Sequence, residues 1–175
     1  MPSFDIRRFC IMSRRSLLLG GAAALTGTQS IGLLLQSPAY AAGKFEVTRT
    51  DEEWRRMLTP AQFSVLRKHK TERAGSSPLD RENRTGTFAC AGCDLPVYRS
   101  ADKFDSGTGW PSFTRPIEGA VGTSEDRSLF ATRTEVHCRR CGGHLGHVFD
   151  DGPKPTGLRY CMNGIAMKFE PTAAS

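Results

Sequence analysis

The sequence predicts a mainly β domain, with an antiparallel core that forms a two-sheet sandwich or a barrel and with short helices in front of it. Two helical patterns follow residue 42, and short apolar runs separated by Gly and Pro come after them. Two Cys-x-x-Cys pairs among these runs indicate a metal clip between distant hairpins. About 130 residues follow the N-terminal segment, which suits one domain.

Residues 1–41 are typical of a cleavable export signal. Ser13-Arg14-Arg15 leads into an apolar run, and Ala39-Tyr40-Ala41 supplies the small residues of a cleavage site. A paired arginine before an apolar run is the mark of a twin-arginine signal. We therefore expect a periplasmic domain of residues 42–175 without a stable membrane anchor, and an uncleaved anchor is the alternative.

The charge of the chain gives no sign of a nucleic-acid partner. The whole chain has 24 Lys and Arg against 18 Asp and Glu. Residues 1–41 hold four of the arginines and one of the aspartates, which leaves 20 against 17, a net charge of +3. Because no basic run is interleaved with aromatic residues, nucleic-acid binding is not predicted. We also expect the protein to be a monomer.

Two short helices are predicted at the start of the domain. Thr50-Asp51-Glu52-Glu53 has the spacing of a capping box, and Trp54, Met57 and Leu58 recur at helical intervals. Thr59-Pro60-Ala61-Gln62 repeats this pattern with proline at the first helical position.

Residues beyond the second helix predict a loop and then strands. His69, near the basic end of that helix, is interpreted as structural or exposed. Residues 75–83 are polar and predict a loop. Apolar runs predict strands at 86–89, 95–98, 128–132, 134–137 and 164–169.

Four of the six cysteines form the pairs Cys90-Ala-Gly-Cys93 and Cys138-Arg-Arg-Cys141, with 44 residues between them. Four thiolates at about 2.3 Å from a zinc ion make a closed tetrahedral site, which leaves no position for catalysis. A redox disulfide in each pair, or bound iron, is the alternative. Two such pairs in one small domain favour a single structural zinc.

Cys161 is the uncommitted thiol of the mature chain, because Cys10 lies in the export signal. Arg159 nearby favours the thiolate, which is the reactive form. His144 and His147 offer an acid that titrates near neutral pH. An inert buried thiol and two satisfied histidines are the simpler interpretation when each residue is taken alone.

Five motifs occur between about Phe45 and Phe169. Because the motifs and their order match those of a known family, the chain resembles the zinc-containing methionine-R-sulfoxide reductases of the B type. The five motifs are Cys90-Ala-Gly-Cys93, Gly109-Trp110-Pro111-Ser112-Phe113, Cys138-Arg-Arg-Cys141, Gly143-His144-Leu145-Gly146-His147-Val148-Phe149 and Arg159-Tyr160-Cys161-Met162-Asn163.

The resemblance implies that Cys161 attacks the sulfur of a methionine sulfoxide, free or in a protein, and becomes a sulfenic acid. His144 or His147, or a water that they hold, would supply protons to the departing oxygen. In the same way, the resemblance implies roles for four further residues. Trp110 packs against the substrate methyl group with Phe113 as the weaker candidate, Asn163 hydrogen-bonds in the site, and Arg159 supports the thiolate.

Thr108 departs from the pattern of many family members, which have a second, resolving cysteine there. We therefore expect an external reductant, a thioredoxin-like protein or a small thiol, to reduce Cys161 directly. Two rival hypotheses remain open. A non-catalytic zinc-ribbon-like binding module explains the cysteine pairs alone, and a thiol-disulfide oxidoreductase would use one of those pairs without zinc.

Overall fold

The computed structural model describes residues 45–129 and 131–173. Two helices come first, α1 (Asp51–Met57) and α2 (Pro60–Lys68). Both capping boxes are formed, since the Thr50 and Thr59 side chains accept from the backbone three residues on and are answered in return. The two predicted helices are therefore confirmed. Met57 is 54% exposed and does not join Trp54 and Leu58 in the core, so the buried face of α1 is narrower than expected.

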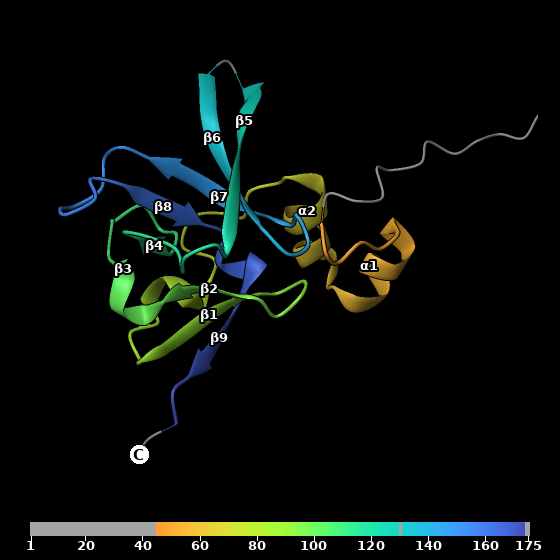
Figure 1. Ribbon diagram of the computed structural model, residues 1–175, viewed down its shortest axis with the longest axis horizontal. Helices are drawn as coiled ribbons and strands as arrows, with labels where there is room; N and C mark the ends of the chain where they lie inside the picture. Colours follow the sequence, from red (N-terminus) through yellow and green to blue (C-terminus); the bar gives the residue numbers. More distant parts are fainter. Residues whose placement is uncertain (1–44, 130, 174–175) are drawn as a thin grey trace, which may run out of the picture. The chain divides into compact units, whose positions relative to one another are not determined.

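Two antiparallel sheets make up most of the rest (Figure 1). One has the order β2-β1-β9 and the other β3-β4-β8-β7-β6-β5. The strands are β1 (Gly86–Cys90), β2 (Pro96–Arg99), β3 (Lys103–Phe104), β4 (Ser112–Phe113), β5 (Val121–Leu129), β6 (Ala131–Cys138), β7 (His144–Phe149), β8 (Arg159–Met162) and β9 (Met167–Pro171). This confirms the mainly β fold with two sheets.

Three expected segments differ in detail. Residues 128–132 are not one strand, because β5 ends at Leu129 and β6 begins at Ala131, so this apolar run spans a hairpin. The predicted strand 164–169 begins as a 3-10 helix, η3 (Gly164–Ala166). The predicted loop 75–83 contains another, η1 (Pro78–Arg81), which Ser77 caps through the backbone N–H of Leu79. A third 3-10 helix, η2, covers Ser100–Asp102.

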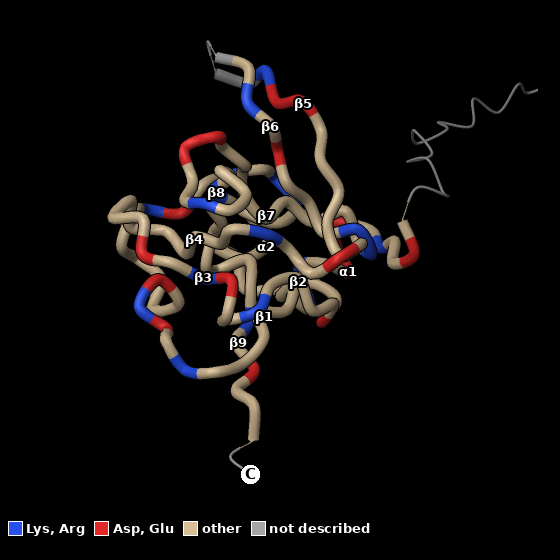
Figure 2. Tube along the Cα trace, turned by 60° about the vertical axis from the view of Figure 1, so that its left-hand side comes forward, with Lys and Arg blue, Asp and Glu red and all other residues tan. Residues whose placement is uncertain are grey.

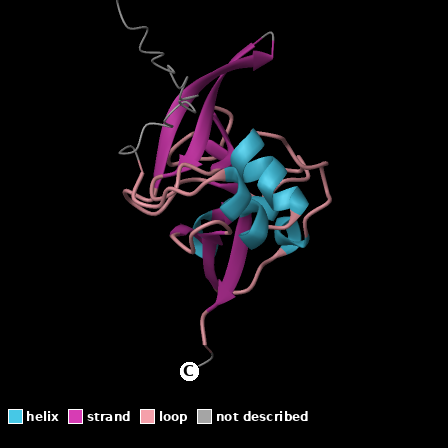
Figure 3. Ribbon diagram, turned by 90° about the vertical axis from the view of Figure 1, so that its right-hand side faces the viewer, coloured by secondary structure: helices cyan, strands magenta, loops and turns pink. Residues whose placement is uncertain are grey.

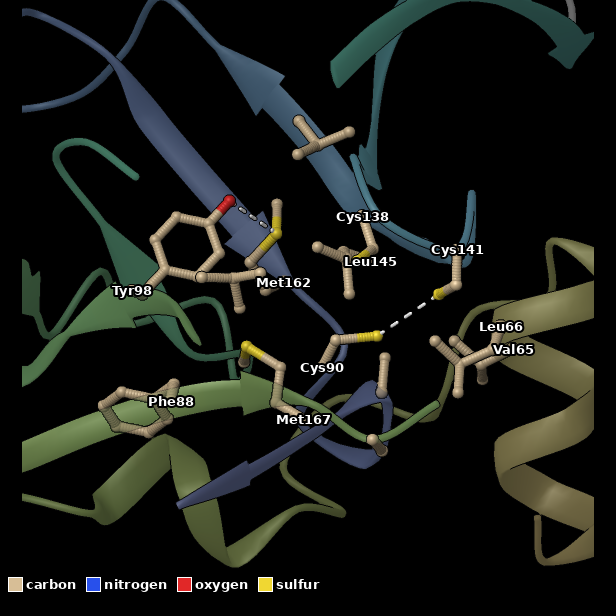
Figure 4. Packing of buried hydrophobic residues seen from close by; sticks show 14 of the residues in the cluster. Val65, Leu66, Phe88, Cys90, Tyr98, Cys138, Cys141, Leu145, Met162 and Met167 are labelled. Atoms are coloured by element: carbon tan, nitrogen blue, oxygen red, sulfur yellow. Dashed lines mark hydrogen bonds between the residues drawn. The ribbon is translucent and has the colours of Figure 1, made fainter. Parts of the chain in front are cut away.

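The core lies between the two sheets and under the helices (Figures 3 and 4). Phe113 of β4 stacks on Tyr98 of β2 with ring centroids 4.3 Å apart, and Phe88 of β1 meets it edge-on. On the other side, α2 packs on β7 and η3, and its Val65 and Leu66 are buried. This packing fixes the six-stranded sheet from one face, and that sheet holds the residues of interest.

Acidic and basic residues are interspersed along the described chain (Figure 2). None of the helices in the described ranges has the length and apolar character needed to cross a membrane. The expected export signal, residues 1–41 with Cys10, lies outside the described residues.

Candidate active site

The two Cys-x-x-Cys pairs come together at one end of the core (Figure 4). Cys90 Sγ lies 3.7 Å from Cys141 Sγ, and Cys93 Sγ lies 3.5 Å from Cys138 Sγ. All four sulfurs lie within 4.8 Å of one another, and none of the five described cysteines is in a disulfide. Four sulfurs around one ion at about 2.3 Å are about 3.8 Å apart in a tetrahedron. The cluster therefore suits a structural metal ion.

Cys161 lies in the middle of β8, between β7 and β4. It pairs with His147 on β7 and with Ser112 on β4. Side chains of directly paired residues project from the same face of a sheet, so Cys161 and His147 face the same side. The thiol is half-buried and opens into a cavity of about 130 Å³. This cavity is lined by Thr71, Trp110, Arg133, Gly146, His147, Phe149, Cys161 and Asn163.

A β-bulge places the two histidines of β7 close together. His137 of β6 pairs with His144, but the next pair is Val136 with Gly146, so Leu145 is an extra residue in β7. The extra residue reverses the alternation of side chains, which brings His144 to the face of His147. Their ring centroids are 5.3 Å apart.

Each of these histidines is bound to a carboxylate. His147 Nε2 lies 2.8 Å from Asp126 Oδ2, and Arg133 donates to the same carboxylate at 2.7 Å. His144 Nδ1 lies 2.7 Å from Glu135 Oε1. His147 lines the cavity of Cys161, whereas His144 is buried behind it.

Glu72 holds two further residues of the cavity in place. Its backbone oxygen accepts a hydrogen bond from Trp110 Nε1 at 3.2 Å, and its backbone N–H donates to Asn163 Oδ1 at 2.9 Å. Asn163 Nδ2 also donates to the Leu145 carbonyl at 3.1 Å. The indole and the amide are therefore fixed in orientation before any ligand binds.

Arg159 is held at the rim of the site. Its guanidinium donates two hydrogen bonds of 2.8 Å to Asp151 and lies 4.5 Å above the Phe149 ring. Its positive charge lowers the pKa of Cys161, but burial raises it more, so the pKa of this thiol lies above its usual value. Burial also lowers the pKa of His147. Both shifts favour a neutral site, with a proton on sulfur and none on the second nitrogen of His147.

Phe113 does not line the cavity. It is fully buried and packs between Phe88 and Tyr98. Although its neighbour Ser112 pairs with Cys161, strand alternation turns the ring of Phe113 to the opposite face of the sheet. The structure therefore gives no support to the expectation that Phe113, the weaker candidate beside Trp110, contacts the substrate.

Comparison with known proteins agrees with this geometry. A family model described as the SelR domain matches residues 58–171, which include every cysteine, histidine and aromatic residue of the site. The chain belongs to the methionine-R-sulfoxide reductase B family.

Curated relatives in this family cover most of the domain. The peptide methionine sulfoxide reductase MsrB of Bradyrhizobium diazoefficiens is 53% identical over 127 residues, which are 72% of this chain and 91% of the relative. The MsrB of Agrobacterium fabrum is 50% identical over 127 residues, 72% of this chain and 94% of the relative. The chloroplastic reductase B1 of Oryza sativa subsp. japonica is 47% identical over 129 residues, 73% of this chain and 60% of the relative.

Sequence reasoning missed the residues that hold the two histidines of this site in place. Asp126, Arg133 and Glu135 come from the β5–β6 hairpin and belong to none of the five motifs, and nothing in their sequence context marks them. Phe149 could have been predicted from the sequence, because residues two apart on a strand share a face and His147 was already a candidate. Gly146 stands between the two histidines of the same motif, but only the structure shows that a Cβ there meets the Cys161 carbonyl oxygen and Met162 inside van der Waals distance.

Proposed function

We propose that this chain reduces the R epimer of methionine sulfoxide, free or in proteins, and that Cys161 is the nucleophile. One observation carries the proposal: an unpaired thiol opens into a small cavity that an oriented indole, an imidazole and an amide complete. The names of its curated relatives support the reaction, since they are peptide methionine sulfoxide reductases.

In this mechanism the Cys161 proton leaves sulfur as sulfur attacks the sulfoxide. The sulfoxide oxygen passes to Cys161, its bond to the substrate sulfur breaks, and methionine departs. The thiol proton ends on the transferred oxygen, so thiol and sulfoxide give sulfenic acid and thioether with no other reagent. His147, with one nitrogen bound to Asp126 and a lowered pKa, carries that proton between the two atoms. His144 is buried behind His147 and acts on it through the edge-on contact of the two rings, whose centroids lie 5.3 Å apart.

The other cavity residues orient the substrate. Trp110 provides an apolar wall for the substrate methyl group, and Asn163 offers its amide to the polar part of the substrate. Arg159, held by Asp151, stabilises the negative charge that develops on Cys161 during the attack.

An external thiol closes the cycle. Its sulfur attacks the sulfenic acid of Cys161, water leaves, and a second thiol releases the mixed disulfide. Thr108 Oγ1 lies 4.0 Å from Cys161 Sγ, where a resolving cysteine would have to be, and it cannot form a disulfide. A thioredoxin-like protein or a small thiol suits this role.

We also propose that the four-cysteine cluster holds zinc and that a twin-arginine signal exports the chain as a folded monomer. Zinc would tie β1 and its turn to the β6–β7 connection and do no chemistry. An N-terminus at residue 42 in periplasmic protein, found by mass spectrometry, supports the export proposal. An intact N-terminus in membranes contradicts it.

The reaction is tested by an epimer-resolved assay on residues 42–175 with dithiothreitol. We expect turnover of the R epimer alone, and Cys161→Ser should abolish turnover while the metal content stays at one ion per chain. The assignment of Cys161 as the nucleophile is contradicted if this variant is fully active. It is also contradicted if a sulfenic acid is trapped at another residue after sulfoxide treatment.

A further inference from the structure

His69, Glu135 and His144 form a cluster of titratable groups behind the Cys161 cavity, where α2, β6 and β7 meet. Glu135 Oε1 accepts from two imidazoles at once, since His144 Nδ1 lies 2.7 Å away and His69 Nδ1 lies 2.9 Å away. Its other oxygen accepts from Ser124 Oγ at 2.6 Å. The pKa of this carboxyl lies well below its usual range because the three donors outweigh its burial.

These contacts define where the protons are. An ionised carboxylate only accepts hydrogen bonds, so each Nδ1 must carry a hydrogen. A neutral His144 is then the Nδ1–H form, and its Nε2 bears none. That Nε2 is buried, and no group in the described ranges hydrogen-bonds to it. The tautomer of His144 is thus set by Glu135.

The two imidazoles differ in their access to water. The His69 side chain is 60% exposed and that of His144 only 2%. His69 is the C-cap of α2, in the left-handed conformation with φ 54°, and its ring contacts Glu135 on β6. A proton that enters this cluster therefore meets the exposed His69 first, and the pKa of His69 is raised chiefly by its hydrogen bond to Glu135.

We propose that Glu135 and His69 are positioning residues for His144. Glu135 fixes its Nδ1–H form, and His69 takes up the proton that the carboxylate would otherwise draw onto His144. His144 stays neutral while His69 carries the charge. The inference rests on the proposed function of the Cys161 cavity, because its consequence for the reaction passes through that site.

The consequence reaches Cys161 through His147. The rings of His144 and His147 are 5.3 Å apart, so a charge on His144 opposes protonation of His147. A neutral His144 leaves His147 able to accept the thiol proton. The other charged groups on the elements around the cluster are Arg67, Lys68, Glu125, Asp126, Arg127 and Arg133.

The test is histidine-labelled NMR on residues 42–175, with long-range ¹H–¹⁵N spectra recorded from about pH 5 to 8. His144 signals are assigned from their loss in His144→Gln. We expect the Nδ1–H form of His144 at neutral pH. Glu135→Gln, which keeps an acceptor, should retain that form, and Glu135→Ala should lose it.

His69→Gln keeps a hydrogen-bond donor but cannot take a proton. It should raise the pH at which His144 becomes protonated by about half to one unit, because Glu135 then faces one imidazole. Lys68→Gln is the matched control: it removes a cation from the same cavity but has no contact with Glu135. Its shift should be much smaller.

Two results overturn the proposal: a wild-type His144 in the Nε2–H form, or a shift in His69→Gln no larger than that in Lys68→Gln. These NMR spectra can be recorded whether or not the protein reduces a substrate. A chain that does not reduce methionine sulfoxide can still give the expected spectra, so the two proposals fail separately.

Discussion

At the scale of the residue, the proposed one-cysteine cycle depends on Thr108, which takes the place of a resolving cysteine. Thr108→Cys should convert the protein to a two-cysteine reductase, because its side chain already lies 4.0 Å from Cys161 Sγ. After one turnover without reductant, we expect a disulfide between positions 108 and 161, seen as two fewer free thiols and a mass lower by two hydrogens than the reduced chain.

Thr108→Ser is the matched control for this variant. It keeps a hydroxyl in the same place, so after one turnover we expect a sulfenic acid at Cys161 both in this variant and in the wild type. If the cysteine variant also accumulates the sulfenic acid, the loop around residue 108 does not bring the two sulfurs into bonding contact.

At the scale of the element, local signals in the sequence predicted the helices and the cysteine pairs. Thr50 and Thr59 each contact a residue three positions on, and such contacts can be found without the fold. The bulge at Leu145 could not be found this way. Strict alternation puts His144 and His147 on opposite faces, and only the pairing of β7 with β6 shows the extra residue. The carboxylates that orient them depend on the same pairing.

Gly146, next to the bulge, allows β7 to lie close to β8. Gly146→Ala adds a Cβ that meets the Cys161 carbonyl oxygen, so the strands must move apart at Cys161. We expect a loss of about 1–3 kcal/mol in the free energy of unfolding, measured with urea, and a larger relative loss of reductase activity.

Gly92→Ala is the control for this change, since its Cβ would meet its nearest neighbours at 3.6 Å, an ordinary contact. It should leave the urea midpoint and the activity close to wild type. Equal behaviour of the two variants would show that the β7–β8 contact has room for a methyl group.

At the scale of the whole molecule, the His69–Glu135 ion pair makes stability depend on pH. The pKa of Glu135 is lowered from 4.5, so its contribution is present above that value and is lost as pH falls. The pKa of His69 is raised from 6.5, so its contribution is complete below that value and is lost as pH rises through the folded pKa.

The difference in urea midpoint between wild type and His69→Gln should therefore be largest between about pH 4.5 and 6.5 and smaller on both sides. Lys68→Gln, whose partner is the exposed Asp51, should show no such maximum in this window. A difference for His69→Gln that stays constant with pH would mean that the pair adds no proton-linked stability.

The four-cysteine cluster brings together segments that lie far apart in the sequence. Cys90 ends β1 and Cys93 lies in the turn after it, whereas Cys138 ends β6 and Cys141 lies between β6 and β7, so a metal ion here connects the two sheets directly. Cys93→Ser should release the ion, measured with a chromogenic chelator, and lower the free energy of unfolding by several kcal/mol.

Cys161→Ser is the control, because it removes a thiol that lies outside the cluster. This variant should keep the ion and the stability while losing activity. If Cys93→Ser unfolds at the wild-type urea midpoint, the packing of Phe113 on Tyr98 and Phe88 holds the sheets together without the ion.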